Sequence, residues 1–411
     1  MAGGSLLENF TTLMESQGPV WMTGPDTWVQ DVSRNTFTLP RITTGNRGAG
    51  MTNLIQGGDV IQDRILLSTT STFVRYNPDA THDAPNPQIG TNITQNWSFG
   101  SASISWNKQE IGLNRSMHGK KYIAQKFKDV MMEKHTNLWV SVCEAIDDEF
   151  WSQPDAGRME STTPTGARVP LSIPCAVNEF PNGLTTAAVD AGGTLWTTIH
   201  GVAPATYANW VCQQEGYTFT GATAIGAATI FAPLSRAFYS TTFDRLPKNE
   251  QYSDKKTSPH VILTSLTGMA NYEFALRANQ DEFRGMGTLS GQDPAYGKPT
   301  FRGIPMDYVS PLATATIYPT AVDEGESTEL DTANATNTGG IGFAGPRYYF
   351  INGEYLKFIV HSENYCVLEK PIIPDGKPFN RAQFMDLWNN NVFRSLRRHA
   401  ILYPSADTTN A

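Results

Sequence analysis

The stretch from Lys120 to Gln153, KKYIAQKFKDVMMEKHTNLWVSVCEAIDDEFWSQ, decides the fold because it predicts one long helix. No glycine or proline interrupts it, and Pro154 follows directly. The 31 residues from Lys121 to Trp151 alone would make a helix of about 46 Å at 1.5 Å per residue, well beyond the usual helix of about 10–14 residues. Apolar residues recur at a three-to-four spacing, which places them on one face of a helix. We therefore expect a helix over 120–152 whose core face carries Phe127, Leu138, Val142, Ile146 and Phe150.

The charges of this helix oppose its own dipole. Lys120 and Lys121 stand in the first turn, and the acidic run Asp147-Asp148-Glu149 stands in the last turn. A helix favours the opposite arrangement, with anions at its N-terminus and cations at its C-terminus. We infer that packing of the apolar face, rather than capping, stabilises this helix.

Upstream of the helix, residues 59–117 predict a long β-hairpin. Its strands run from about Val60 to Tyr76 and from about Thr94 to Leu113, both rich in β-formers. The tip between them is rich in proline, and the tip residues that we single out are Tyr76, Asn77, Pro78, Pro85 and Pro87. Two strands alone are marginal in water, so the hairpin is expected to rest on another surface. Residues 1–58 show little periodicity and are expected to form an extended arm.

Downstream of the helix, strands and helices mix in an α+β pattern. After an irregular stretch, the patterns predict helices over Ala224–Thr242 and Leu266–Asn279, with strands over His260–Thr264 and Thr300–Met306. Residues 346–411 read mainly as strands. Two of them flank Asn352-Gly353, a strong hairpin signal, and Phe384 to Tyr403 predicts another long strand or strand pair.

Composition excludes several classes of protein. Charged residues are 17% of the 411, against an average of about 25%, and the formal net charge is -8. Such a balance argues against a protein that coats nucleic acid, which would show a basic stripe. No apolar run reaches the roughly 20 residues of a membrane helix, and the N-terminus lacks the pattern of a secretory signal. The four cysteines are far apart, as expected for structural thiols in a reducing compartment.

No catalytic, cofactor or metal motif is evident. The seven histidines are scattered without the spacing of a zinc site, and the glycine-rich pieces lack the context of a phosphate loop. Cys143 lies on the apolar side of the long helix and is expected to be a core thiol. The acidic loop Asp323–Asp331 is either a divalent-cation site or a solvated surface, and its spacing lacks the EF-hand order. Three arginines near the C-terminus form a basic group that is expected to contact partner carboxylates, with phosphate as the alternative: Arg394, Arg397 and Arg398.

The order of these parts resembles the major capsid protein of tailed double-stranded DNA bacteriophages, the Hong Kong 97-like fold. The local stretches Thr198-Ile199-His200-Gly201, His260 to Ser265 and Phe301-Arg302-Gly303-Ile304-Pro305-Met306 resemble segments of that family. The resemblance implies an N-terminal arm (1–58), an E-loop hairpin (59–117) and a P-domain (118–200) with the spine helix. It further implies an A-domain (201–345) and returning P-domain strands (346–411).

The same resemblance implies a function. The chain would be a shell subunit without enzymatic activity, which assembles with itself into hexamers and pentamers around double-stranded DNA that it does not read by sequence. It implies a portal and decoration proteins as partners, assembly in the host cytoplasm and a final place in the virion. We expect scaffolding to come from a separate protein or to be unnecessary. The three arginines and the hairpin tip would contact neighbouring subunits. Because Ile65 to Gln95 contains no lysine, we expect no crosslink of the kind that some members form through an E-loop lysine.

Two alternatives remain at this point. An encapsulin-like nanocompartment shares the implied fold, although such chains are usually shorter. A different phage structural protein, such as a tail component, would be richer in β-structure than the predicted helices allow.

Overall fold

The computed structural model describes 17 stretches of the chain. They are residues 52–55, 57–66, 75, 90–107, 119–151, 167–177, 198–203, 206–207, 209–218, 227–242, 260–278, 299–302, 304–309, 312, 346–353, 355–374 and 376–405. The arm up to residue 51, the tip residues Tyr76, Asn77, Pro78, Pro85 and Pro87, and the acidic loop Asp323–Asp331 lie outside these stretches.

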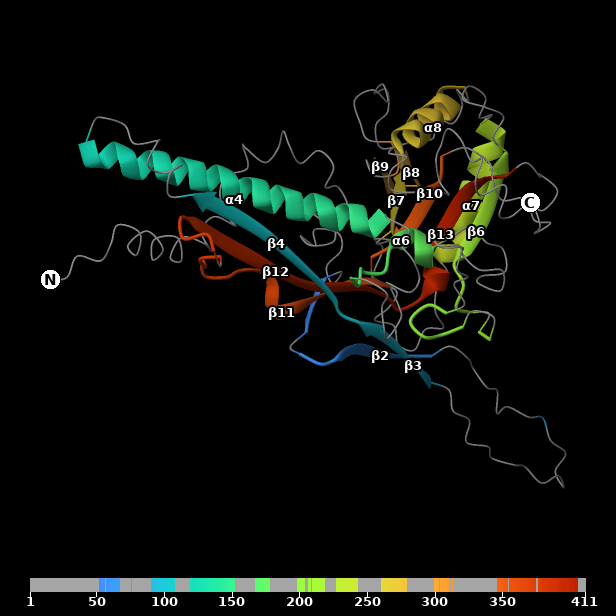
Figure 1. The fold of residues 1–411 in the computed structure, drawn as a ribbon. Coiled ribbons are helices and arrows are strands. Elements are labelled where there is room, and N and C mark those ends of the chain that lie inside the picture. The colour runs from blue at the N-terminus through green and yellow to red at the C-terminus, as the bar shows by residue number, and fades with distance from the viewer. Residues whose placement is uncertain are drawn as a thin grey trace, which may run out of the picture.

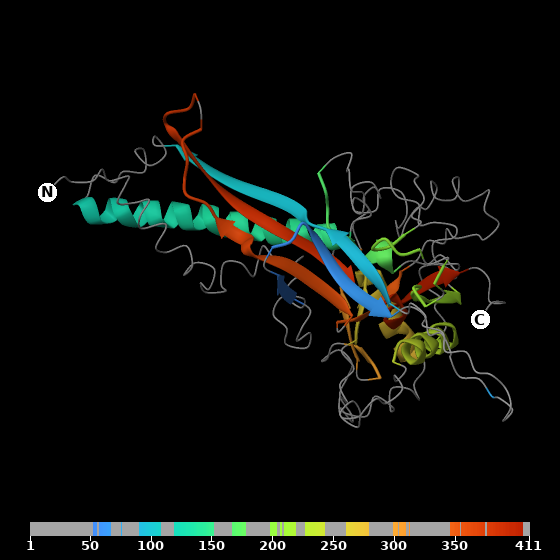
Figure 2. The same cartoon turned by 90° about the horizontal axis from the view of Figure 1, so that it is seen from below.

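A long helix lies along a four-stranded sheet. The helix α4 spans Gly119–Trp151, close to the expected 120–152. The sheet has the order β1-β11-β12-β4, and its strands span Thr52–Ile55 (β1), Leu356–Leu368 (β11), Asn380–Phe393 (β12) and Ser98–Asn107 (β4). Figure 1 shows α4 running beside β4 and β12, and Figure 2 shows it behind the strands, on one face of the sheet.

Burial explains why α4 stays on this sheet. Leu138, Val142, Ile146 and Phe150 are all buried in one core cluster with residues of β11 and β12. The ring of Phe150 meets Phe358 of β11 edge to face, with the centroids 5.3 Å apart. Phe127 lies within α4, but its side chain is outside what the structure describes.

A second sheet has six strands in the order β6-β13-β10-β7-β9-β8. Their bounds are Gln213–Thr218 (β6), Ala400–Ser405 (β13), Tyr348–Asn352 (β10), His260–Thr264 (β7), Ile304–Tyr308 (β9) and Thr300–Phe301 (β8). The helices α7 (Ala227–Thr241) and α8 (Leu266–Ala278) contact each other through Phe231 and Tyr272. A short buried helix, α6, spans Ile173–Ala176.

Strand β10 carries buried apolar side chains on both of its faces, so its sequence is an apolar run. Tyr348 and Phe350 belong to the cluster of α7 and α8, whereas Tyr349 and Ile351 belong to the cluster of α4. The ring of Tyr349 packs on Trp151 at the end of α4, with centroids 5.4 Å apart. A strand buried on both faces has no reason to alternate polar and apolar residues.

The prediction of a β-hairpin at Asn352-Gly353 is wrong. Strand β10 pairs with β7 and β13, while β11 pairs with β1 and β12, so the two strands that flank the turn lie in different sheets. Both edges of β10 are therefore already occupied. Residues 346–411, expected as one set of returning strands, are divided in the same way, because β10 and β13 join the six-stranded sheet.

A two-stranded ribbon extends from the four-stranded sheet. Its strands β2 (Val60–Leu66) and β3 (Gly90–Asn96) pair antiparallel from Val60 opposite Asn96 to Leu66 opposite Gly90. The sequence predicted one continuous second strand from Thr94 to Leu113, but the chain changes sheets at Trp97. There β3 ends, and β4 begins to pair with β12. We call β2 and β3 the ribbon, and the end near Trp97 its root.

Candidate functional site

The described residues do not bring metal-binding side chains together. No group of three His, Cys, Asp or Glu side chains within these stretches could hold a metal ion. No helix in the same part of the chain is long and apolar enough to cross a membrane. Several side-chain hydrogen bonds that join distant segments of the described chain lie together at the root of the ribbon, which we take as the candidate site.

Trp97 closes the root. Its ring is buried, and its Nε1–H donates a hydrogen bond to the carbonyl oxygen of Gly58 at 2.8 Å, which joins the chain before β2 to the chain after β3. The hydroxyl of the next residue, Ser98, donates to the Arg168 carbonyl at 2.8 Å. Hydrogen bonds of Trp97 and Ser98 therefore hold the chain at the point where it passes from the ribbon to the four-stranded sheet.

His200 connects the root to β12. Its Nε2 accepts a hydrogen bond from the backbone N–H of Phe393 at 2.9 Å, so this nitrogen carries no proton. The proton of the neutral ring is then on Nδ1, which lies 2.9 Å from Oε1 of Gln95 in β3 and donates to it. The backbone N–H of Thr94 also donates to the carbonyl of His200 at 3.2 Å. Burial lowers the pKa of His200 to about 3, because a charged ring would lose its hydration.

The backbone around His200 is a tight two-residue turn. Ile199 and Val202 bond to each other in both directions at 3.0 Å, and the φ angles of His200 and Gly201 are 55° and 74°. Positive φ at both central residues is the mark of a type I′ turn. Glycine adopts this geometry freely, whereas histidine does so less often. The indole Nε1–H of Trp210 donates to the Ile199 carbonyl at 3.2 Å and supports the turn from behind.

Adjacent asparagines of β12 fasten a second segment to the root. Asn390 and Asn391 are fully buried. Asn390 accepts the backbone N–H of Leu171 at 3.0 Å and donates to the carbonyl of Asn96 at 2.5 Å, while Asn391 donates to the Leu171 carbonyl at 2.6 Å. The amide of Asn390 is bonded at both ends, whereas Oδ1 of Asn391 has no hydrogen-bond partner among the described residues. Buried side-chain hydrogen bonds of this kind favour one arrangement of the chain.

The arginines expected to contact other subunits have partners within the chain. Arg394 forms an ion pair with Asp63 of β2 at 2.5 Å, and both side chains are partly exposed. Arg397 is exposed and donates to Asn209 at 3.2 Å. Arg398 differs from the expectation, because it is buried, donates to the Thr241 carbonyl at 3.3 Å and lies over the Tyr355 ring. A side chain held inside its own subunit is not available to a neighbour.

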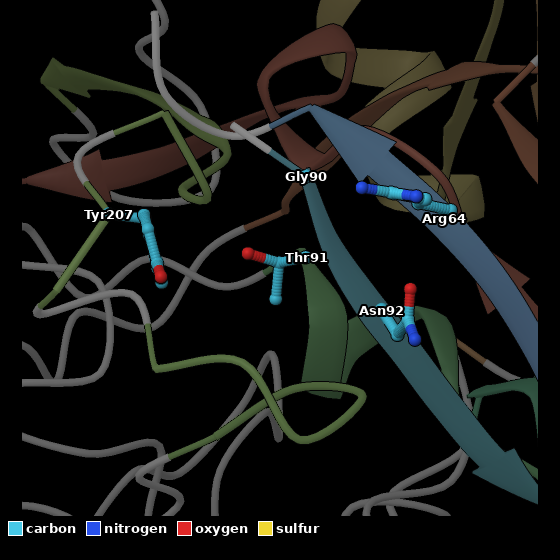
Figure 3. Close-up of a pocket in the computed structure, with 5 residues that line it drawn as sticks. All are labelled: Arg64, Gly90, Thr91, Asn92 and Tyr207. Atoms are coloured by element: carbon cyan, nitrogen blue, oxygen red, sulfur yellow. The ribbon is translucent and has the colours of Figure 1, made fainter. Parts of the chain in front are cut away.

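An open pocket of about 540 Å³ lies beside the ribbon. Arg64, Gly90, Thr91 and Asn92 line it from the ribbon, and Tyr207 lines it from the segment that follows the His200 turn (Figure 3). The ribbon side chains and Tyr207 stand on opposite sides of the space.

Two of the four thiols, those of Cys143 and Cys366, are poor nucleophiles. All four cysteines are free of disulfides. Burial, together with Asp147 and Glu144, raises the pKa of Cys143 to about 11, and burial raises that of Cys366 to about 12. A thiol of this kind holds its proton at neutral pH and is a poor nucleophile.

Sequence reasoning did not identify the root as a site. Thr198 to Gly201 was noted as a family-like stretch, but no role was assigned to His200. The run Asn389-Asn390-Asn391 inside a predicted strand was a usable signal, because consecutive amides in a strand must either face water or be satisfied internally.

Comparisons with known proteins returned only solved structures. No protein-family model matches the chain, and no curated protein matches it. The chain is similar to the capsid of cyanophage P-SCSP1u, with 10% identity, a TM-score of 0.44 and 87% of each chain covered. It is also similar to the capsid of Staphylococcus phage Andhra, with 9% identity, a TM-score of 0.44 and 93% and 87% covered. A third similar structure is the capsid of cyanophage A-1(L), with 11% identity and a TM-score of 0.44. The match covers 87% of this chain and 91% of that chain.

These capsids are the kind of protein that the sequence resemblance named. All three TM-scores are below 0.5, so the function of this chain has to follow from its own residues and surfaces.

Proposed function

We propose that this chain is the major capsid protein of a tailed double-stranded DNA bacteriophage, a subunit that assembles with copies of itself into an icosahedral shell. One observation carries the proposal: the described part of the chain is built from extended elements that remain open at their edges within that part. A 33-residue helix lies on a four-stranded sheet, and a two-stranded ribbon leaves that sheet. Such elements gain their full set of partners from neighbouring copies.

The open edges are specific. Within the described stretches, β1 and β4 have one strand neighbour each, and the two strands of the ribbon pair only with each other. Unpaired strand edges attract further chains unless they are covered, and a two-stranded sheet is marginal by itself. A shell covers both kinds of edge by packing one subunit against the next.

Exposed apolar side chains support the same proposal. Phe99 is 54% exposed on β4, where its ring meets Trp388 edge to face. Ile373 and Phe379 are 54% and 59% exposed on the connection between β11 and β12. Large exposed apolar side chains are available for contacts, so in this proposal we assign these positions to contacts between subunits.

The parts take the roles that the resemblance implies. In the proposal, α4 is the spine helix of the P-domain, the ribbon is the start of the E-loop, and the six-stranded sheet is the core of the A-domain. Strands β10 and β13 pair inside that sheet, so the proposal assigns them to the A-domain. Among the three arginines, Arg394 and Arg397 remain candidates for contacts between subunits, because both are exposed.

The proposal includes a setting. The net charge of -8 suits a container whose wall must not adhere to packaged DNA. We infer that a separate scaffolding protein, a portal and decoration proteins act with the chain, that assembly takes place in the host cytoplasm, and that the finished product is part of the virion. In this proposal the chain has no enzymatic activity.

Negative-stain electron microscopy of the purified chain, with size-exclusion chromatography beside it, tests the proposal. We expect closed shells, or hexamers and pentamers, when the chain is expressed with the neighbouring phage genes. A folded monomer or dimer that stays small with scaffold and crowding agents added would overturn it. Shells that enclose protein cargo and no DNA in infected cells would favour the encapsulin-like alternative.

A further inference from the structure

The polar contacts between the ribbon and the body of the chain gather at the root. Asp63 bonds Arg394, Thr94 and Gln95 bond His200, and the Asn96 carbonyl accepts from Asn390. Every one of these ribbon residues lies within the last four register pairs, between Val60 opposite Asn96 and Asp63 opposite Ile93. The buried apolar side chains of the described ribbon, Ile61 and Ile93, lie there too, while Ile65 farther along is partly buried against the same cluster.

Beyond these pairs the ribbon borders open space. The pocket shown in Figure 3 separates Thr91 and Asn92 from Tyr207, the residue of the body that faces them. Arg64, which also lines this pocket, is exposed. Among the described residues, the polar contacts of the ribbon with the body are therefore concentrated at the root.

His200 is the contact that joins three separate segments. Its ring binds β3 through Gln95 and the end of β12 through Phe393, while its own backbone belongs to the turn at 199–202. The left-handed conformation of a buried, non-glycine residue persists only where its surroundings hold it. Here the two ring bonds and the Thr94–His200 backbone bond hold it.

We propose that the ribbon detaches from the body as one cooperative unit and that His200 controls how often it does so. Proteins open locally in units whose free energy depends on their own contacts rather than on global stability. The ribbon has its own ladder of seven register pairs, which does not use the bonds that tie it to the body, so its strands can leave the body together. Loss of the His200 bonds then exposes the root while the four-stranded sheet stays folded. The inference concerns the single chain and stands whether or not that chain assembles.

Native-state hydrogen exchange with mass spectrometry on the purified, unassembled full chain tests this inference. The reporter is a peptide that covers β3, and the reference is a peptide that covers 380–389 of β12, which is paired with β4. In the wild type we expect the Thr94 amide, which donates to the His200 carbonyl, to exchange faster than the reference, with a weaker dependence on denaturant. His200→Asn keeps a residue type that tolerates the left-handed conformation but loses the acceptor for Phe393.

For His200→Asn and for Gln95→Ala we expect exchange at the root to rise about ten- to a hundredfold, the range for losing one or two buried hydrogen bonds, with the reference unchanged. Thr264→Val is the matched control. This side chain is also buried, but its hydroxyl donates to the Arg347 carbonyl in the six-stranded sheet, so its loss should act there and not on the ribbon. Wild-type root and reference amides that exchange together, with the same dependence on denaturant, would overturn the inference. So would folded His200 variants whose root exchanges as in the wild type.

Discussion

Replacing Phe150 by alanine tests the packing of α4 most directly. Phe150 is fully buried and touches Phe358 edge to face at 5.3 Å. Removing a buried phenylalanine ring costs about 3–5 kcal/mol, of which about 0.5–1.5 kcal/mol belongs to the aromatic pair. Phe150→Leu keeps most of the apolar volume and should cost about 1–1.5 kcal/mol. Ile146→Ala, at the neighbouring buried position, should fall within about 2–5 kcal/mol.

The assay is urea unfolding of the purified chain, followed by circular dichroism, with the yield of soluble subunit as a second readout. We expect the midpoint to fall in the order wild type, Phe150→Leu, Phe150→Ala, at an unchanged slope. Ser141→Ala, on the exposed side of the same helix, is the control and should match the wild type. A Phe150→Ala midpoint equal to that of Ser141→Ala would refute the reasoning, because it would mean that the helix is held by something other than this face.

Three further predictions follow from the root and the thiols. Asn391→Ala leaves the Leu171 carbonyl without its donor and should lower the free energy of unfolding by about 1–3 kcal/mol, measured by urea unfolding against an exposed Gln62→Ala control. The pKa of His200 is lowered to about 3 in the fold from an unfolded value of 6.5, so its contribution is complete above pH 6.5 and is lost as the pH falls toward 3; the wild-type slope of stability over pH 4–6 should exceed that of His200→Asn by up to about 1.4 kcal/mol per pH unit. Cys143 and Cys366, whose pKa values are raised to about 11 and about 12, should react with a thiol reagent at pH 8 far more slowly in the fold than in urea; equal rates would contradict their burial.

Long periodic segments were predictable because their information is local. The spacing of Leu138, Val142, Ile146 and Phe150 gave α4 within one residue at each end, and their burial follows from the same period. The strand His260–Thr264 was predicted with its observed bounds, since a short apolar run between polar flanks has few other solutions.

Pairing partners were not predictable in the same way. Asn352-Gly353 is a strong turn signal, but a turn says nothing about whether the edge of the next strand is free. Strand β10 finds β7 and β13 at its edges, and these partners lie about 50–90 residues away in the chain. The end of β3 at Trp97 was unpredictable for the same reason. Strand β4 pairs with β12, which lies nearly 300 residues later in the chain.

The root was hidden for a related reason. The two ring bonds of His200 reach residues 105 and 193 positions away, which no local pattern can reveal. The buried asparagines of β12 gave a detectable signal, because side-chain amides in the middle of a buried strand need hydrogen-bond partners. Their partner Leu171 could only be found once the chain was folded.

The six-stranded sheet has a consequence for how this protein can be divided. Its two strands β13 and β10, which join β6 to β7, come from the last 64 residues of the chain, whereas the other four lie between 213 and 308. A gene fragment covering 201–345 would leave β6 separated from β7, β9 and β8, with an apolar gap two strands wide. Recombination between relatives could therefore exchange this sheet only as a discontinuous unit, with the carboxy-terminal strands inherited alongside it. Transplanting the sheet onto another scaffold would require a circular permutation that brings β10 and β13 next to the rest.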